Sequence, residues 1–248
     1  MTRTRAAGIH FLICLAVGLA LFALFWFVWY PAPTFVAIGA HQIFFLVVGI
    51  DIIIGPLLTF IVFKSGKKTL KFDLTVIALL QVCALVYGVY TLLQARPAYI
   101  AALGGQFQVI QATEIEDGDY AKAKTAPPWF GPKLVGTKAP TDQDDIDALS
   151  TLAMAGGGPG HMPQLHIDYE LMRDEIIKNA QPIADLKNAN PSQGSEIDNW
   201  LVSKGSSADS AKFQSVRVNA SFFAIVLDAK TARIIGIAPF NPAHPSSK

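Results

Sequence analysis

Charged residues and cysteines are both scarce in this sequence. Only 16% of its 248 residues are Asp, Glu, Lys or Arg, and the two cysteines, Cys14 and Cys83, both lie inside long apolar runs. The remainder of the chain therefore cannot form a disulfide bond within itself. At about 150 residues, that remainder is long enough to bury an ordinary core without a crosslink. We interpret both cysteines as packing residues.

Motifs of catalysis and cofactor binding are also lacking. The stretch "GGGPGHMPQLH" (156–166) has no Gly-Lys-Ser/Thr ending of a phosphate loop, and its two histidines lack the i, i+4 spacing and intervening Glu of a helical zinc site. The acidic cluster 142–147 lacks the Gly and final Glu of a calcium loop. We expect a flexible loop and a solvated helix start here, and no enzyme, metal, cofactor or small-molecule substrate. No basic patch follows the apolar runs, which argues against nucleic-acid binding.

Three long segments contain no Lys or Arg: Phe11–Trp29, Ile43–Phe63 and Leu74–Leu93. Each has about the 20 residues that a helix needs to cross a ~30 Å hydrocarbon core. They predict three transmembrane helices within residues 1–96, followed by a soluble domain at 97–248. The first segment could instead be a cleaved signal peptide, but its apolar run is too long for one, which favours an uncleaved anchor.

The basic residues predict the orientation of these helices. Arg3 and Arg5 precede the first segment, four lysines lie in the second connection "KSGKKTLKFD" (64–73), and the first connection (30–42) has no Lys or Arg. By the positive-inside rule, the N-terminus and the lysine-rich connection are cytoplasmic, and residues 97–248 lie on the opposite side of the membrane.

Five residues are predicted to mark the membrane boundaries. Trp29 and Tyr30 end the first segment, at the depth where aromatic belts lie. Asp73 precedes "LTVIALL" and is predicted to cap the third helix at its cytoplasmic end. Arg96 can extend to the lipid headgroups beyond that helix, and Pro97 stops its propagation.

One carboxylate interrupts the second segment, "FFLVVGIDIIIGPLLTFIVF" (44–63). A charged Asp at mid-membrane costs roughly 2.5–3.5 kcal/mol on insertion scales, so Asp51 needs a reason to be there. Eight residues into its predicted segment, it lies about 12 Å from the boundary, level with Tyr87 and one to two turns from Gln81. One interpretation is a neutral Asp51 bonded to Tyr87 or Gln81, joining two helices. The other is that Asp51 meets a polar group on a partner's membrane helix.

The dipeptide Gly55-Pro56 follows Asp51 by one turn of the same helix. Proline frees a backbone carbonyl and favours a kink, which could leave a notch for a partner helix. The alternative is a kink absorbed within the three-helix bundle. Gly49 and Gly55 are six residues apart and do not form a small-residue seam on one helix face.

The C-terminal region reads as an α+β domain. The segment "QFQVIQATEI" (106–115) alternates like a half-buried strand, and "ASFFAIVLDAKTARIIGIAPF" (220–240) reads as a hairpin around 228–231. Helices are predicted at "TDQDDIDALSTLAMA" (141–155), "HIDYELMRDEIIKNA" (166–180) and "SEIDNWLVSKG" (195–205). Strands at both ends with helices between them favour an α+β arrangement.

Several stretches resemble one protein family: "WYPAPTF" (29–35), "VVGIDIIIGPLLTFIVF" (47–63), the lysine-rich connection and "FDLTVIALLQVCALVYGVYTLLQARPAYI" (72–100). Over roughly residues 8–112 the chain resembles the TfpX/TfpZ type IV pilin accessory proteins. The resemblance implies a multi-pass protein of the bacterial inner membrane that is not an enzyme. Its C-terminal domain would lie in the periplasm. Its partners would be membrane lipid and a type IV pilin, whose stability or assembly into surface pili it would support in a chaperone-like manner.

Two other classes of function remain open from the sequence. A membrane-anchored sensor with a periplasmic ligand-binding domain is the first alternative, although the short cytoplasmic segments leave no output domain. A membrane enzyme is the second, and it lacks a catalytic constellation.

Overall fold

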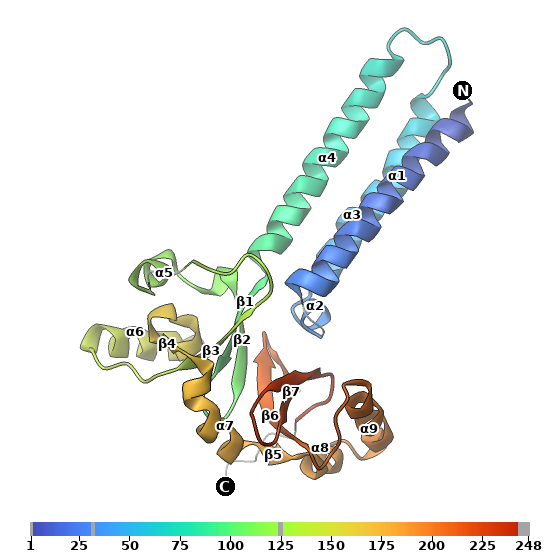
Figure 1. The fold of residues 1–248 in the computed structure, drawn as a ribbon. Helices are drawn as coiled ribbons and strands as arrows, with labels where there is room; N and C mark the ends of the chain where they lie inside the picture. The colour runs from blue at the N-terminus through green and yellow to red at the C-terminus, as the bar shows by residue number, and fades with distance from the viewer. Residues whose placement is uncertain (1, 31–32, 124–125, 243–248) are drawn as a thin grey trace. The chain divides into compact units, whose positions relative to one another are not determined.

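The computed structural model describes residues 2–30, 33–123 and 126–242, which form two compact units. One unit contains three apolar helices and ends at Arg96. The other begins at Pro97 and also includes a short helix, α2 (Thr34–Ala37), from the first connection (Figure 1). Three helices long and apolar enough to cross a membrane, followed by a mixed helix and sheet domain, confirm the predicted fold class.

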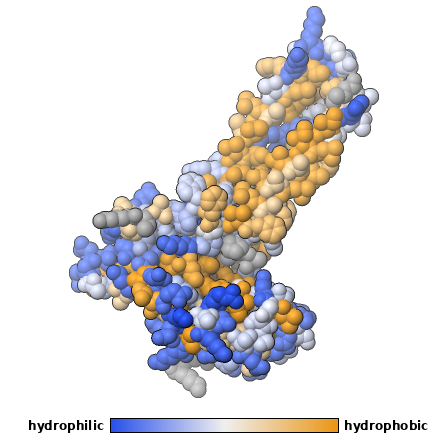
Figure 2. Space-filling view, in the orientation of Figure 1, coloured by the Kyte–Doolittle hydropathy of each residue, from blue (hydrophilic) through white to orange (hydrophobic). Residues whose placement is uncertain are grey.

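Each apolar segment corresponds to a helix that is longer than the sequence predicts, although the second helix ends one residue before Phe63. The bounds are α1 (Arg3–Leu24) continued by the π-helical turn η1 (Phe25–Trp29), α3 (Ala40–Val62) and α4 (Leu70–Gln94). The Thr2 side chain caps α1 at the Arg5 amide, 3.3 Å away, so the helix starts before its apolar run. Gly39, with φ +84°, sets the start of α3 at Ala40. Figure 2 shows apolar side chains along these helices, as a lipid-facing surface requires.

Asp73 does not cap the third helix. Helix α4 begins at Leu70, so Asp73 lies one turn inside it. Its carboxylate forms a 2.6 Å ion pair with Lys67 and accepts a 3.2 Å hydrogen bond from the Thr69 hydroxyl. The prediction was wrong because the residues before Asp73 already adopt helical geometry, and a carboxylate in the first turn is still favourable there.

At the opposite end of the bundle, the boundary residues are buried. Trp29 packs its ring against Phe25, and the Tyr30 hydroxyl donates a 2.5 Å hydrogen bond to the carbonyl of Leu92. Arg96 is only 4% exposed and donates from Nη1 to the Leu93 carbonyl at 2.7 Å. Carbonyls in the last turn of α4, which lack partners within the helix, thus accept hydrogen bonds from the Tyr30 hydroxyl and the Arg96 guanidinium. Pro97 opens a strand directly after the helix, as predicted.

Each of the three helices runs antiparallel to the next one along the chain, and α3 packs against both α1 and α4. Two glycines permit close approaches between aliphatic side chains and a neighbouring helix. A Cβ on Gly18 would lie 2.7 Å from the Val48 side chain, and one on Gly88 would lie 2.7 Å from that of Val47. Neither position was predicted from the sequence. Gly18 is ten residues from Gly8 and Gly88 is the one glycine of α4, so no small-residue spacing marks them, and only the packed bundle shows which glycine faces a neighbour.

Gly88→Ala is expected to destabilise the bundle by roughly 1–3 kcal/mol, because the added methyl group overpacks the contact with Val47. The measurement is unfolding of the purified chain in mixed micelles by SDS titration. Gly49→Ala is the matched control, since a Cβ there meets nothing within 4 Å. Equal unfolding midpoints for the two variants would show that the Gly88 contact is not tight in solution.

The C-terminal domain is built on one mixed sheet with strand order β4-β3-β1-β2-β6-β7-β8, and β5 pairs with β6 (Figure 1). Strand β1 lies parallel to β3, β2 lies parallel to β6, and the other neighbours are antiparallel. The strands are β1 (Pro97–Ala102), β2 (Phe107–Gln111), β3 (Lys133–Thr137), β4 (His166–Ile167), β5 (Gln181–Pro182), β6 (Ala211–Val218), β7 (Ser221–Asp228) and β8 (Ile234–Ala238).

Apolar side chains cover both faces of this sheet. In β7, Ile225 and Leu227 belong to one buried cluster, while Ala224 and Val226 belong to another, as the two-residue period of a strand requires. The first cluster includes residues of the helical segment 169–176 and is contacted by Ile38, which follows α2. The second includes residues of α8 and α9. The domain helices are α5 (Asp117–Ala123), α6 (Gln143–Met154), α7 (Arg173–Asn179), α8 (Ile183–Ala189) and α9 (Gly194–Ser203).

The structure confirms the β7–β8 hairpin and the helices α6 and α9. Asp142 caps α6 by accepting a 3.0 Å hydrogen bond from the Asp145 amide. The predicted helix at 166–180 is wrong in its first half, which forms β4 and a 3₁₀ turn, η5 (Tyr169–Met172), before α7 begins. The Tyr169 ring belongs to the core, and its hydroxyl donates to the Ala232 carbonyl at 2.7 Å. This long-range contact overrides the local helical pattern.

The stretch 156–166 is a packed turn, not the flexible loop that the sequence favours. Two 3₁₀ turns, η3 (Pro159–His161) and η4 (Pro163–Leu165), bury the His161 ring, and His166 lies edge-on to Tyr99. A Cβ on Gly160 would lie 2.9 Å from the Ala101 side chain, so the turn sits directly on β1. Glycine here permits close packing.

Acidification is expected to lower the thermal stability of the C-terminal domain. Burial lowers the pKa of both His161 and His166 below the ordinary value of 6.5. The unfolded chain therefore binds these protons more readily, and stability present above about pH 6.5 is lost as the pH falls through the folded-state values. Calorimetry of the full chain in detergent should show a falling midpoint below that pH. The double variant His161→Gln, His166→Gln should flatten the dependence, and an unchanged slope would contradict the assignment.

Candidate functional site

Asp51 lies at the centre of α3, eleven residues from both Ala40 and Val62, and is only 7% exposed. At 1.5 Å per residue, each end of the helix is about 16 Å away. The predicted segment begins at Ile43 and therefore lacks the first turn of α3. Gln81 lies eleven residues into α4, so both polar residues are central in their helices. This is the depth at which an unpaired charge costs most.

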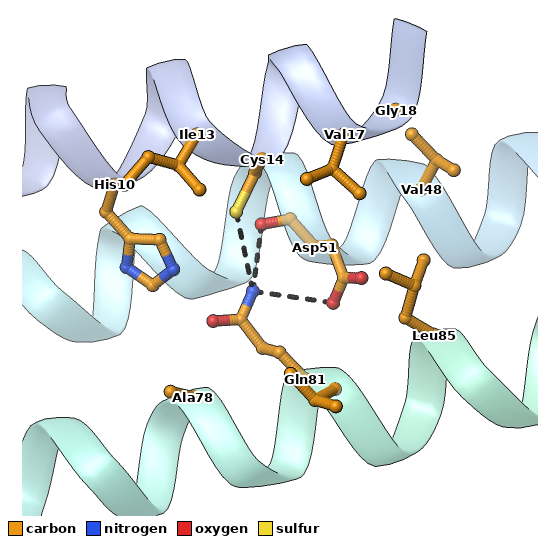
Figure 3. Close-up of a pocket in the computed structure, with 11 residues that line it drawn as sticks. His10, Ile13, Cys14, Val17, Gly18, Val48, Asp51, Ala78, Gln81 and Leu85 are labelled. Atoms are coloured by element: carbon orange, nitrogen blue, oxygen red, sulfur yellow. Dashed lines mark hydrogen bonds between the residues drawn. The ribbon is translucent and has the colours of Figure 1, made fainter. Parts of the chain in front are cut away.

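One carboxamide joins all three helices at this level (Figure 3). Gln81 Nε2 donates to the backbone oxygen of Asp51 at 3.1 Å, lies 3.4 Å from Asp51 Oδ1, and lies 3.9 Å from Cys14 Sγ. The structure thus contains the predicted bond to Gln81. The alternative bond to Tyr87 is wrong, because Tyr87 is 72% exposed. Six residues separate it from Gln81, which turns it to another face of α4.

Gly55 makes room for the Gln81 carboxamide. A Cβ at Gly55 would collide with that group, and both Gly55 and Pro56 are buried inside the bundle. Helix α3 continues through Pro56 to Val62. The space beside Gly55 and Pro56 is therefore filled from α4 and is not a notch open to a partner, which agrees with the alternative of a proline absorbed within the bundle.

A cavity of about 190 Å³ lies beside Asp51, between the three helices. Its walls are mainly apolar, and they come from α1, α3 and α4. The lining residues are His10, Ile13, Cys14, Val17, Gly18, Val48, Asp51, Ala78, Gln81, Val82 and Leu85. Four of them carry polar or polarisable groups, and Figure 3 shows Gln81, Asp51 and Cys14 joined by the three contacts above. We call this space the Asp51 cavity.

His10 is the residue of this site that the sequence analysis missed. Its Nδ1 lies 2.6 Å from the hydroxyl of Thr59, a buried residue of α3, and its ring lines the Asp51 cavity. His10 precedes the first apolar segment, which was therefore taken to begin at Phe11. The sequence around His10, "GIHF" (8–11), gives no periodic signal, and only the length of α1 brings His10 into the bundle.

The Asp51 cavity has unused hydrogen-bonding capacity. Gln81 Oε1 is buried and has no partner within the described part of the chain. A carboxyl group accepts more hydrogen bonds than the single one that Gln81 offers. No Lys or Arg is among the described residues that line the cavity. Unsatisfied polar groups are costly in hydrocarbon, so the arrangement can bind a donor or cationic group carried on an apolar segment.

Comparison with known proteins points to one family. The model of "Fimbrial assembly protein FimB" matches residues 1–39. Two relatives from Dichelobacter nodosus, "Fimbrial assembly protein, serogroup E1" and "Fimbrial assembly protein, serogroup I", are each 29% identical over 232 residues, 90% of both chains. A third from that organism, "Fimbrial assembly protein, serogroups C1 and C2", is 42% identical over 99 residues, 39% of this chain and 75% of the relative. No solved structure matches. The chain belongs to the family of fimbrial assembly proteins.

Proposed function

We propose that this chain is an accessory protein of the TfpX/TfpZ kind, which supports a type IV pilin in a chaperone-like manner during assembly into surface fimbriae. Residues 1–96 would form a three-helix domain in the bacterial inner membrane, with the N-terminus in the cytoplasm. Residues 97–248 would form a periplasmic domain. The fimbrial assembly family and the three apolar helices support this proposal.

The Asp51 cavity suggests how the chain would bind a pilin. A type IV pilin is held in the membrane by an apolar N-terminal helix before it is assembled. The cavity offers such a helix an apolar wall with a polar group at mid-membrane depth. In this proposal Asp51 contacts the pilin helix directly, and Gln81 holds the carboxyl in place. Gly55 and Pro56 act indirectly, by giving Gln81 its space.

The proposed role is one of binding and requires no catalytic step or cofactor. An interhelical hydrogen bond formed inside hydrocarbon averages only about 0.6 kcal/mol, so most of the affinity would come from packing along the cavity wall. The polar contact would instead fix the register of the bound helix. Weak, specific binding suits an accessory protein, because the pilin must leave it to enter the fimbria.

A deletion strain tests the function. Surface fimbriae and total cellular pilin are quantified separately, with the gene supplied in trans as the control. Loss of surface fimbriae at normal pilin level would place the protein at assembly, and loss of both would indicate stabilisation of the membrane-embedded pilin. If neither quantity changes, the proposed function is wrong.

A further inference from the structure

A cleft of about 450 Å³ lies within the C-terminal domain, between α6 and the segment that leads into α5. Figure 1 shows α5 and α6 next to one another, and Lys122 of α5 reaches within 3.5 Å of Asp145 of α6. One wall is formed by the 3₁₀ turn η2 (Ala112–Glu114) and the residues after it, and the other by α6. Buried residues at the end of η3 form the floor. All of the lining residues belong to this one domain.

Helix α6 leaves one of its sides uncovered. No residue of α6 is buried. The residues of α6 and its C-cap that line the cleft lie three or four apart and so share one side of the helix: Ala148, Thr151, Leu152 and Ala155. This side is mainly aliphatic, and the buried Met162 side chain continues it onto the floor. At 1.5 Å per residue, the cleft has an apolar strip about 10 Å long.

The opposite wall of the cleft is acidic. Glu114 and Glu116 are both exposed, and neither forms an ion pair with any residue that the structure describes. One carboxylate oxygen of Glu114 accepts a 2.7 Å hydrogen bond from the Gln111 amide. The lysine of this wall, Lys122, is held by Asp145, which does not line the cleft. Two carboxylates therefore face the cleft without a counter-charge from the described residues.

His161 adds a third polar group at the floor. Its side chain is only 6% exposed and lines the cleft. Nδ1 lies 3.2 Å from the amide nitrogen of Gly158 and 3.3 Å from its carbonyl oxygen, whereas Nε2 has no hydrogen-bond partner within the described ranges. Burial lowers the pKa of this imidazole, so the ring is neutral near neutral pH. With Nδ1 donating to the carbonyl, Nε2 is an acceptor that is left for a ligand.

We propose that this cleft binds an arginine side chain on a basic segment of a polypeptide partner. A guanidinium carries five N–H donors in a planar fork, which suits the two carboxylates and Nε2 of His161 together. The aliphatic stem of the arginine packs along the apolar strip of α6, while its charged head lies at the acidic wall. Lysine has three donors and no planar fork, so arginine is the preferred residue.

A polypeptide is the occupant that shape and charge favour. The apolar strip extends over two turns of α6, so residues on either side of the arginine also find contacts along it. Residues 97–248 contain thirteen Lys and Arg against seventeen Asp and Glu, a net charge of −4, which attracts a basic partner and repels an anionic lipid surface. The proposal does not depend on the fimbrial subunit being that partner.

Fluorescence polarisation with the full chain in a neutral detergent tests the proposal. The probe is a short capped peptide of arginine, alanine and glycine that carries a neutral fluorophore. The control peptide has citrulline in place of each arginine, which keeps the shape and removes the charge. The arginine peptide is expected to bind saturably, and the citrulline peptide about tenfold more weakly, because it loses its charge-assisted hydrogen bonds.

Two pairs of variants locate the binding. Thr151→Trp fills the cleft, and Ser150→Trp is its control, since both residues are exposed and bond to the carbonyl four residues earlier, but Ser150 does not line the cleft. Thr151→Trp should weaken binding of the arginine peptide about tenfold, and Ser150→Trp should not. Glu116→Gln should weaken it several-fold, whereas Asp144→Asn, which removes an exposed carboxylate outside the cleft, should leave it unchanged.

The opposite results overturn the proposal. Equal binding of the citrulline peptide would show that the guanidinium is not recognised. Equal affinities of Thr151→Trp and Ser150→Trp, at thermal midpoints equal to that of the original protein, would place the peptide on another acidic surface. If Thr151→Trp fails to fold, equal affinities of Glu116→Gln and Asp144→Asn lead to the same conclusion. Free argininamide that binds as tightly as the peptide would assign the cleft to a small cation.

Discussion

Asp51→Leu is expected to abolish surface fimbriae while leaving the cellular level of the protein unchanged or higher. The substitution removes a carboxyl whose cost at mid-membrane is roughly 2.5–3.5 kcal/mol. It also removes the contact between Asp51 Oδ1 and Gln81, an interhelical bond of a type that averages about 0.6 kcal/mol. The second Gln81 contact, to the backbone oxygen of residue 51, survives. The balance favours a bundle at least as stable as the original.

This balance makes the substitution decisive between the two interpretations of Asp51. If the carboxyl only joins α3 to α4, leucine is harmless or beneficial and fimbriae remain. If the carboxyl meets a group on the pilin helix, fimbriae are lost from a stable protein. Asp51→Asn keeps the shape and one acceptor oxygen, so it should retain part of the activity against a neutral donor and little against a cation. The measurements are immunoblotting of membranes and quantification of sheared surface fimbriae.

Thr59→Val is the matched control for Asp51→Leu. Thr59 is also a buried polar residue of α3, and its hydroxyl bonds to His10 on a neighbouring helix. Unlike Asp51, it is not among the residues that line the cavity. We expect Thr59→Val to retain fimbriae. Equal loss from both variants would attribute the effect to bundle packing, and a reduced protein level in Asp51→Leu would assign that residue a folding role.

The helical part of the fold was predictable because its signal is long and local. Each apolar segment extends for about 20 residues, and no alternative structure satisfies its backbone in lipid. Helix ends were less predictable, since capping by Thr2 or a turn at Gly39 adds residues without hydrophobic character. The observed start of α3 at Ala40, three residues before Ile43, places Asp51 at the centre of its helix.

The sequence alone could not decide whether Gln81 or Tyr87 bonds to Asp51. Depth along the membrane follows from counting residues, but the facing side of each helix depends on how α3 and α4 rotate against one another. The rotation is set by the close approach at Gly88 and by the space at Gly55. The sequence does not indicate that either glycine lies at the contact between α3 and α4. A pair of polar residues at equal depth can therefore be proposed from sequence, but its contact cannot.

In the C-terminal domain, β2, β7 and β8 were predicted from the sequence, whereas β1, β3, β4, β5 and β6 were not, although β6 pairs with β7 across the short turn at 219–220. The β7–β8 hairpin closes through Asp228, whose carboxylate accepts from the Lys230 and Thr231 amides. Strands β1 and β3 are five or six residues long and pair with each other only after a long excursion through α5. Strands as short as these carry too little pattern to separate them from loop.

A larger side chain that fills the Asp51 cavity from α4 is expected to have the second large effect on surface fimbriae. Ala78 lines the cavity together with Gln81, Val82 and Leu85, which share one face of α4 at helical spacing. Because Ala78 is exposed on the unoccupied side of this face, a larger side chain there meets open space in the free protein. Ala78→Phe should leave the bundle intact and exclude a bound helix. An overpacking cost of roughly 1–3 kcal/mol would weaken that binding by about 5- to 150-fold.

Ala84→Phe provides the matched control, because it makes the same substitution in the same helix. Ala84 is also exposed but does not line the cavity, and six residues turn it well away from the face of Ala78. Ala78→Phe should reduce surface fimbriae strongly and Ala84→Phe should not, at equal membrane levels of both variants. Because Ala78→Phe keeps Asp51 and Gln81 in place, it tests the occupied volume separately from the polar contact. Normal fimbriae in Ala78→Phe, together with their loss in Asp51→Leu, would move the partner away from the cavity and leave Asp51 acting through the bundle.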